Sequence, residues 1–105
     1  MKPMINHRKF LLEDLKDPAE AAGYLNAVLE TGHRDAFLSA LRDVAAAQGG
    51  LSKLARQTKL HRQTIHRMLS KNGNPEIVSL EKVLEAMGLR FFVGVNPSAK
   101  LPRAA

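Results

Sequence analysis

The sequence predicts an all-α domain of five helices, followed by one short β-strand near the C-terminus. Apolar residues recur every three or four positions in several segments, which is the period of a helix buried along one face. Gly and Pro residues separate these segments, where they start or stop helices. Only residues 89–95, LRFFVGV, have the β-branched and aromatic composition of a strand. At 105 residues the chain is long enough for one domain with a single core.

The first two helices are predicted from their end signals. Asp17 is a favourable N-cap and Pro18 suits the first helical position, so a helix begins there and ends at Gly32. A second helix runs from about residue 35 to 48 and stops at the pair Gly49 and Gly50. Residues 1–12, which precede these signals, are predicted to form an extended arm.

The next two helices are predicted from a break in the apolar pattern. Ser52 is the expected cap of a third helix. If that helix continued past residue 58, Leu60 would point about 180° away from its apolar stripe. A turn at residues 59–61 instead lets Leu60 face inward, and a fourth helix then buries Ile65, Met68 and Leu69. The loop 71–75 ends this helix.

The fifth helix is predicted over residues 79–86, with Ser79 as its cap and Gly88 as its stop. The strand-like run 89–95 cannot be stable alone. It either docks on its own chain as an extended segment or pairs with the same strand of a second chain. The resulting organisation is an arm at 1–12, a single domain at 13–95 and a flexible tail at 96–105.

The charge of the chain is concentrated in one segment. The formal net charge is +6, and residues 51–71 carry six basic residues, while residues 44–75 contain no Asp or Glu. A local field of one sign attracts polyanions. Nucleic acid is the commonest such partner, an anionic membrane surface is a second, and a solvated basic face without a ligand is the alternative to both. The six residues are Lys53, Arg56, Lys59, Arg62, Arg67 and Lys71.

Residues 51–70, LSKLARQTKLHRQTIHRMLS, resemble a helix-turn-helix of the Xre/Cro type. Ala55 is small where the second helix crosses, Leu60 closes the turn, and Ile65 holds the recognition helix. The resemblance implies a five-helix lambda-repressor-like domain. Two positions depart from the pattern: Lys59 stands where Gly is usual because the backbone is left-handed there, and His61 stands where a Ser or Thr cap is usual.

The outer face of the recognition helix has side chains suited to duplex DNA. Arg can bond to guanine, Gln to adenine, and Thr can contact bases through its hydroxyl or methyl group. The predicted base-contacting residues are Arg62, Gln63, Thr64, His66 and Arg67. The predicted phosphate-contacting residues are Ser52, Lys53, Arg56 and Lys71, together with amides near the start of the third helix.

A longer region, from about residue 21 to 90, resembles the HigA-like addiction-module antidote family. The shared pieces are YLNAVLE at 24–30, LSKLA at 51–55, GNP at 73–75 and MGL at 87–89. The resemblance implies an antitoxin that neutralises a RelE/ParE-like toxin and represses its own operon. The docking mode of a helix-turn-helix further predicts that the protein binds operator DNA as a homodimer. Seven of the ten acids precede Val44, so the N-terminal half could suit a basic toxin. The alternatives are a stand-alone or phage-type repressor and an antitoxin whose DNA surface is vestigial.

Other classes of function have little support in the sequence. The chain has no Cys, and His61 and His66 are five apart, which does not place them on one helix face as a metal pair. No Gly-rich phosphate loop or Ser/His/Asp arrangement is recognisable, so we expect neither catalysis nor a cofactor. No apolar run reaches the roughly 20 residues of a membrane span, and we expect a cytoplasmic protein.

Overall fold

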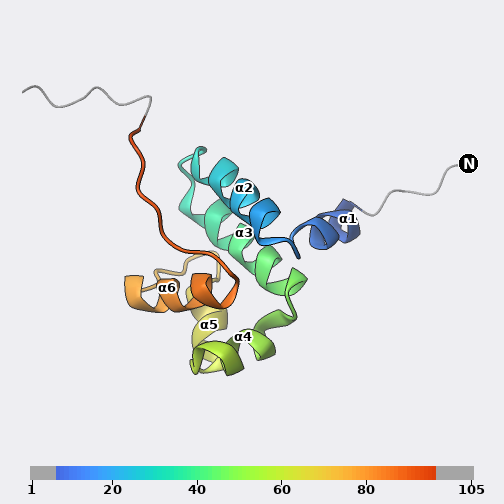
Figure 1. Ribbon diagram of the computed structural model, residues 1–105. Helices are drawn as coiled ribbons and strands as arrows, with labels where there is room; N and C mark the ends of the chain where they lie inside the picture. Colours follow the sequence, from blue (N-terminus) through green and yellow to red (C-terminus); the bar gives the residue numbers. More distant parts are fainter. Residues whose placement is uncertain (1–6, 97–105) are drawn as a thin grey trace, which may run out of the picture.

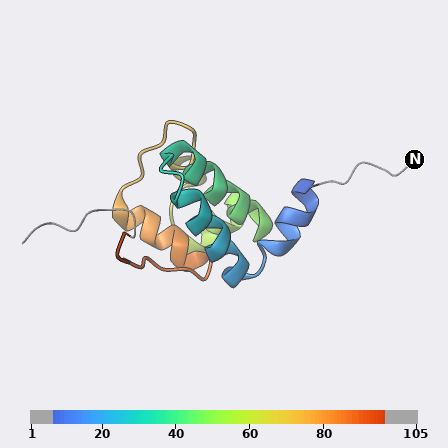
Figure 2. The same ribbon diagram turned by 90° about the horizontal axis from the view of Figure 1, so that it is seen from above.

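The computed structural model describes residues 7–96, and all regular secondary structure within this range is α-helical. It has six helices here: α1 (His7–Asp14), α2 (Pro18–Leu29), α3 (Arg34–Ala47), α4 (Gly50–Thr58), α5 (Arg62–Met68) and α6 (Ile77–Ala86). Helices α2 and α3 lie side by side, and α4, α5 and α6 gather at one end of this pair (Figure 1). Seen from above, α1 and α6 lie toward opposite ends of the molecule (Figure 2). The predicted all-α class is confirmed.

Helix α1 lies where the sequence predicted an extended arm, so the described part of that arm, residues 7–12, is helical instead. Leu11 packs against the core, and Leu15, four residues later, is fully buried. The Arg8 guanidinium donates to the Asp43 carboxylate of α3 at 2.9 Å. This docking explains the extra helix, because a helix this short is marginal unless another element covers its apolar side. Residues 1–6 lie outside the described residues.

The predicted start of α2 is confirmed, whereas the helix ends at Leu29, three residues before the predicted stop at Gly32. The Asp17 carboxylate accepts a hydrogen bond from the Ala19 amide at 3.0 Å, and Pro18 is the first helical residue. Gly32 follows the helix with a φ of 77° in the left-handed region. The turn between α2 and α3 is therefore determined by residues local to it.

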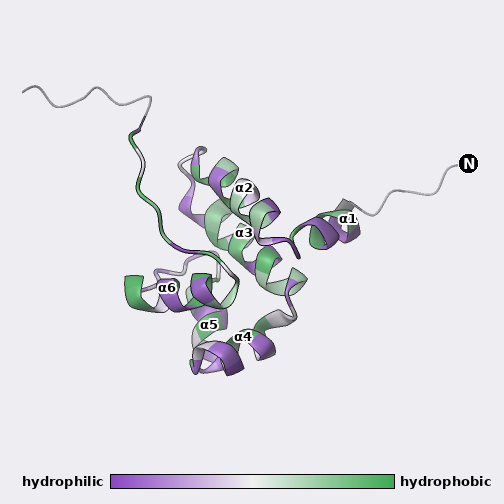
Figure 3. Cartoon of the chain, viewed as in Figure 1, coloured by the Kyte–Doolittle hydropathy of each residue, from purple (hydrophilic) through white to green (hydrophobic). Residues whose placement is uncertain are grey.

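The core is built from apolar side chains of α2–α6 and of the residues that directly follow α1, α5 and α6. Their packing places α4 against α3, α5 and α6. The outer sides of α4 and α5 remain in solvent, as the purple colour of their outer surfaces in Figure 3 illustrates. The largest fully buried side chains are Leu15, Leu38, Leu41, Val44, Ile65, Leu69, Val83 and Met87.

Two predicted helix caps are wrong. Helix α4 begins at Gly50 with Gly49 as its N-cap, so Ser52 is its third residue. Helix α6 begins at Ile77 with Glu76 as its N-cap, so Ser79 also lies inside a helix. Neither observed cap makes a side-chain hydrogen bond. Tertiary packing, rather than capping chemistry, therefore sets where these two helices begin.

The predicted strand at residues 89–95 does not form within the described chain, which contains no β-strand between residues 7 and 96. Gly88 has a φ of 78°, and the Leu89 amide donates to the Leu84 carbonyl at 2.8 Å, closing the end of α6. The chain then runs away from α6 as an irregular segment (Figure 1). The physical reason is that a single chain supplies this segment with no second strand. The predicted tail beyond residue 96 lies outside the described residues.

Candidate nucleic-acid interface

The turn between α4 and α5 is held by one residue in an uncommon backbone conformation and by one hydroxyl group. Lys59 adopts φ 61° and ψ 21° and is the one non-Gly residue with positive φ among residues 7–96. The Thr58 hydroxyl donates to the Leu54 carbonyl at 2.8 Å and accepts from the Leu60 amide at 3.2 Å. Helix α4 therefore stops at Thr58, and Leu60 turns inward to pack against the core, as its position in the sequence predicted.

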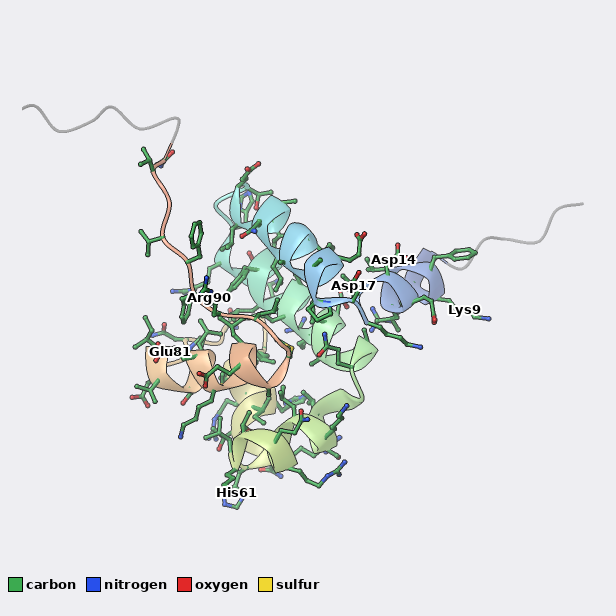
Figure 4. The ribbon with its side chains drawn as sticks, viewed as in Figure 1. Lys9, Asp14, Asp17, His61, Glu81 and Arg90 are labelled. Atoms are coloured by element: carbon green, nitrogen blue, oxygen red, sulfur yellow. The ribbon has the colours of Figure 1, made fainter. Side chains whose placement is uncertain are left out.

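The inner side of α5 anchors the helix and the outer side is free. Ile65 and Met68 are buried, as is Leu69 directly after the helix. His61 precedes the helix without making a side-chain cap, as expected for this residue type. It lies at the far end of the α4–α5 pair and points away from the other helices (Figure 4). The end of the folded domain that carries α5 is therefore open to a partner.

Most of the predicted base-contacting residues are brought together on this outer side. Arg62, Gln63, His66 and Arg67 are exposed and line one shallow depression together with Ser70. Thr64 is half-buried and lies apart from this depression, in a second one that Arg67 shares with the 72–76 loop. The helix thus presents four of the five predicted side chains as one surface and the fifth at its margin.

The predicted phosphate-contacting residues lie on α4 and directly after α5, and all of them are exposed. Lys53 and Arg56 project from α4, and Lys71 follows α5. Ser52 is also exposed but lies within the first turn of α4 rather than at its cap. None of these residues forms an ion pair within the described chain, because both ion pairs there involve other residues. Their positive charge is therefore not neutralised internally.

The C-terminal end of α5 is held by contacts that the sequence alone did not reveal. The Arg42 guanidinium of α3 donates to the Leu69 carbonyl, which places a cation at the negative end of the helix dipole. The Ser70 hydroxyl donates to the Arg67 carbonyl at 2.7 Å. Gly73 is buried beside the same turn, and its amide donates to the Ser70 carbonyl at 2.8 Å. These groups position α5 without touching any ligand.

The acidic residues lie mainly away from this surface. Asp14 and Asp17 are on the α1–α2 side of the molecule, at a distance from His61 (Figure 4). Several of the N-terminal acids have internal partners: Asp43 accepts from Arg8 and from the Tyr24 hydroxyl, both at 2.9 Å. Burial, together with the hydrogen bond to Asp43, raises the pKa of Tyr24 to about 12. The structure therefore separates a basic end from a mixed-charge end.

Two other kinds of site were sought in the part of the chain that the structure describes. No group of three or more His, Asp or Glu residues is placed to hold a metal ion there. None of the helices α1–α6 is both long and apolar enough to cross a bilayer.

Comparison with known proteins defines the class of this chain. The family of probable addiction module antidote proteins matches residues 7–95, and the chain belongs to that family. The match covers all six helices, including the docked α1 and most of the segment after α6. The sequence resemblance to an addiction-module antidote is thereby confirmed.

One curated relative is similar over most of its length. An uncharacterized protein of Haemophilus influenzae (strain KW20/Rd) is 36% identical over 81 residues, which cover 77% of this chain and 82% of the relative. No solved structure matches the chain. An antidote acts on a toxin, so a toxin is the general class of partner that family membership implies.

Proposed function

We propose that this protein is a cytoplasmic, non-catalytic antitoxin of a type II toxin–antitoxin module that binds operator DNA as a homodimer through α4 and α5. In this role it represses its own operon and neutralises a RelE/ParE-like toxin by direct binding. One observation carries the DNA-binding part: Arg62, Gln63, His66 and Arg67 form a continuous exposed surface on a helix anchored by Ile65 and Met68. The arrangement of α4, the Lys59 turn and α5 supports a helix-turn-helix of the Xre/Cro type.

The side chains on this surface divide into two roles. Residues near the start of a recognition helix reach base edges in the major groove, which suits Arg62, Gln63 and, at its margin, Thr64. Arg67, one turn further along, would extend the contact, with His66 beside it. Lys53, Arg56, Lys71 and the first turn of α4 at Ser52 would hold the phosphate backbone. Residues 44–75 contain no acid, so neither α4 nor α5 carries a carboxylate that would repel the phosphates. Glu76 lies at the margin of the surface, in the depression that Thr64 and Arg67 also line.

The DNA-binding proposal is tested with the DNA upstream of the gene in a fluorescence anisotropy assay. Arg67→Ala should cost roughly 1–3 kcal/mol of preference for this DNA over a random duplex, because a base contact is lost. Lys53→Ala should weaken binding to both duplexes by the same factor. It should also reduce the slope of log affinity against log salt concentration by about one. Arg34→Ala is the matched control, since Arg34 is exposed at the far end of α3. Equal affinity of the unaltered protein for both duplexes would refute sequence-specific binding.

The toxin-binding part is tested separately with the neighbouring reading frame. We expect it to encode a small basic protein whose toxicity is relieved when this chain is co-expressed and which co-purifies with it. The mixed-charge α1–α3 side is the proposed docking side, because a basic partner would be repelled by the α4–α5 end. DNA binding without a toxic neighbour would favour the stand-alone repressor, and toxin binding without DNA binding would favour the vestigial surface.

A further inference from the structure

An open groove lies between α2 and the segment that follows α6. Its lining is apolar apart from the side chains of Asn26 and Arg90. Three of the lining residues expose large apolar surface to solvent: Phe92 is 84% exposed, Leu29 51% and Phe91 42%. Apolar surface that gathers at one concave place in this way marks a site where a partner binds.

The α2 wall of this groove has the form of a helix-binding face. Pro18, Ala22, Leu25 and Leu29 line it at intervals of three and four residues, so they make one row along the helix. At 1.5 Å per residue the row is about 16 Å long, which is the length of about three turns of a second helix. Ala22 is small between larger neighbours, so a ridge of side chains on that second helix can enter the row there.

The surroundings of the groove are acidic. Four acids stand directly beside lining residues in the sequence, and no Lys or Arg outside the lining does so. All four acids are exposed, and none forms an ion pair with another described residue. Basic groups of a partner would therefore be attracted to this rim while its apolar side chains enter the groove. The acids are Asp17, Glu20, Glu30 and Glu85.

We propose that the groove binds an amphipathic, basic helix of the toxin. The apolar stripe of that helix lies between α2 and residues 88–92, and its Lys or Arg residues lie over the four acids of the rim. This is the recognition mode in which an amphipathic helix enters a hydrophobic groove. The inference rests on the proposed neutralisation of a basic toxin, and it specifies the surface and the chemistry by which the toxin is recognised.

A second copy of this chain fits the groove less well than a basic toxin does. In a two-fold contact the same surface of both copies meets, so the two acidic rims would face each other. Like charges placed opposite one another in an interface oppose binding. The four acids of the rim also repel the phosphates of DNA, so the groove suits a cationic protein best.

The groove is separate from the candidate DNA surface. No residue lines both the groove and either of the two depressions beside α5. Arg90, in the lining of the groove, and His61, next to α5, lie on opposite sides of α6 in Figure 4. A toxin helix in the groove would therefore leave the outer side of α5 uncovered.

The groove is tested with the full chain and the purified product of the neighbouring reading frame, by isothermal titration calorimetry. Leu29→Lys removes an exposed apolar side chain and places a cation in the groove, so affinity for the toxin should fall at least about tenfold. A cation at the last residue of α2 suits the helix dipole, so the fold should be retained. Ala27→Lys is the matched control and should leave the affinity unchanged, because Ala27 is exposed on α2 but does not line the groove.

Charge reversal tests the acidic rim. Glu30→Lys should weaken toxin binding by about three- to tenfold at low salt and by less at high salt, since salt screens exposed charges. Asp14→Lys is the matched control and should leave toxin binding unchanged. Asp14 is likewise an exposed acid at the C-terminal end of a helix, but it is not beside any residue of the groove.

Cross-linking identifies the toxin segment that binds. The chain has no Cys, so Ala19→Cys gives one attachment point for a benzophenone at the end of the α2 row. We expect this label to capture a toxin segment that has apolar residues three and four apart and Lys or Arg beside them. Capture of an acidic segment, or of one without this spacing, would overturn the inference.

The remaining outcomes separate this inference from the proposed function. Equal toxin affinity of Leu29→Lys and Ala27→Lys, with unchanged helical circular dichroism in both, would overturn the groove and leave toxin neutralisation standing. Loss of self-association in Leu29→Lys with full toxin affinity would assign the groove to a second copy. No binding of the toxin by the unaltered chain would overturn the neutralisation itself. No DNA is used, so these results do not depend on DNA binding.

Discussion

Replacing Gly by Ala should lower the free energy of unfolding at Gly73 and raise it at Gly23. Gly73 is buried in the loop after α5, and a Cβ built there would overlap the Met68 carbonyl oxygen, 2.7 Å from the Met68 carbonyl carbon and 3.0 Å from the Arg67 carbonyl oxygen. These are backbone atoms at the end of α5 and cannot rotate away. Gly23 lies in the exposed middle of α2, and a Cβ there meets nothing within 4 Å.

The magnitudes follow from these two environments. Relieving the overlap at Gly73 requires the loop to move, which costs about 1–3 kcal/mol as overpacking. The move also weakens the hydrogen bond from the Gly73 amide to Ser70, which adds about 1 kcal/mol. Gly73→Ala should thus lower the free energy of unfolding by about 2–4 kcal/mol. Gly23→Ala should raise it by about 0.5–1 kcal/mol, because Ala restricts the unfolded chain and favours the helix.

Both variants can be measured by urea and thermal unfolding followed by circular dichroism. For a domain of this size, about 1 kcal/mol corresponds to roughly 4–8 °C in Tm, so Gly73→Ala should lower Tm by roughly 8–32 °C and Gly23→Ala should raise it by roughly 2–8 °C. A neutral Gly73→Ala would refute the packing of the 71–75 loop against α5. Because that loop holds the end of α5, the Gly73 variant should also bind DNA less specifically at temperatures where it remains folded.

Two further predictions concern single groups. Tyr24 is the only tyrosine, so its phenolate absorbance should titrate with a midpoint near the pKa of about 12 rather than 10, and Asp43→Asn should move the midpoint down. Since the folded pKa is raised, the stabilisation is present below about pH 10 and is lost between pH 10 and 12; a midpoint near 10 in the unaltered protein would contradict the contact with Asp43. Ser52→Ala should change the free energy of unfolding by less than about 0.5 kcal/mol, because Ser52 is not the cap of α4. A loss near 1 kcal/mol in denaturant unfolding would show that it does act as a cap.

The turn before α5 shows how far local sequence can predict a site. Leu60 does not fit the apolar stripe of the preceding helix, which predicted a break at residues 59–61. The structure has this break, with Lys59 in the left-handed conformation. The buried residues Ile65, Met68 and Leu69 were likewise predicted from their spacing. These features depend on residues a few positions apart, so periodicity and turn chemistry carry the necessary information.

The starts of α4 and α6 show where the same reasoning fails. Ser52 and Ser79 are good caps by residue type, yet both helices begin two residues earlier, at Gly50 and Ile77. Capping contributes only about 1 kcal/mol, which packing against the core can outweigh. The sequence also provided no second strand for residues 89–95, and within one described chain the segment remains irregular.

By itself the sequence determined the all-α class, the break that creates α5 and the concentration of positive charge in residues 51–71, because each is encoded by neighbouring residues. Only the tertiary structure decided that α1 forms and docks, and how the end of α5 is held. Arg8 meets Asp43 35 positions away, and Arg42 meets Leu69 27 positions away. Contacts at such separations exist only once the core has brought the helices together, so no local pattern can report them.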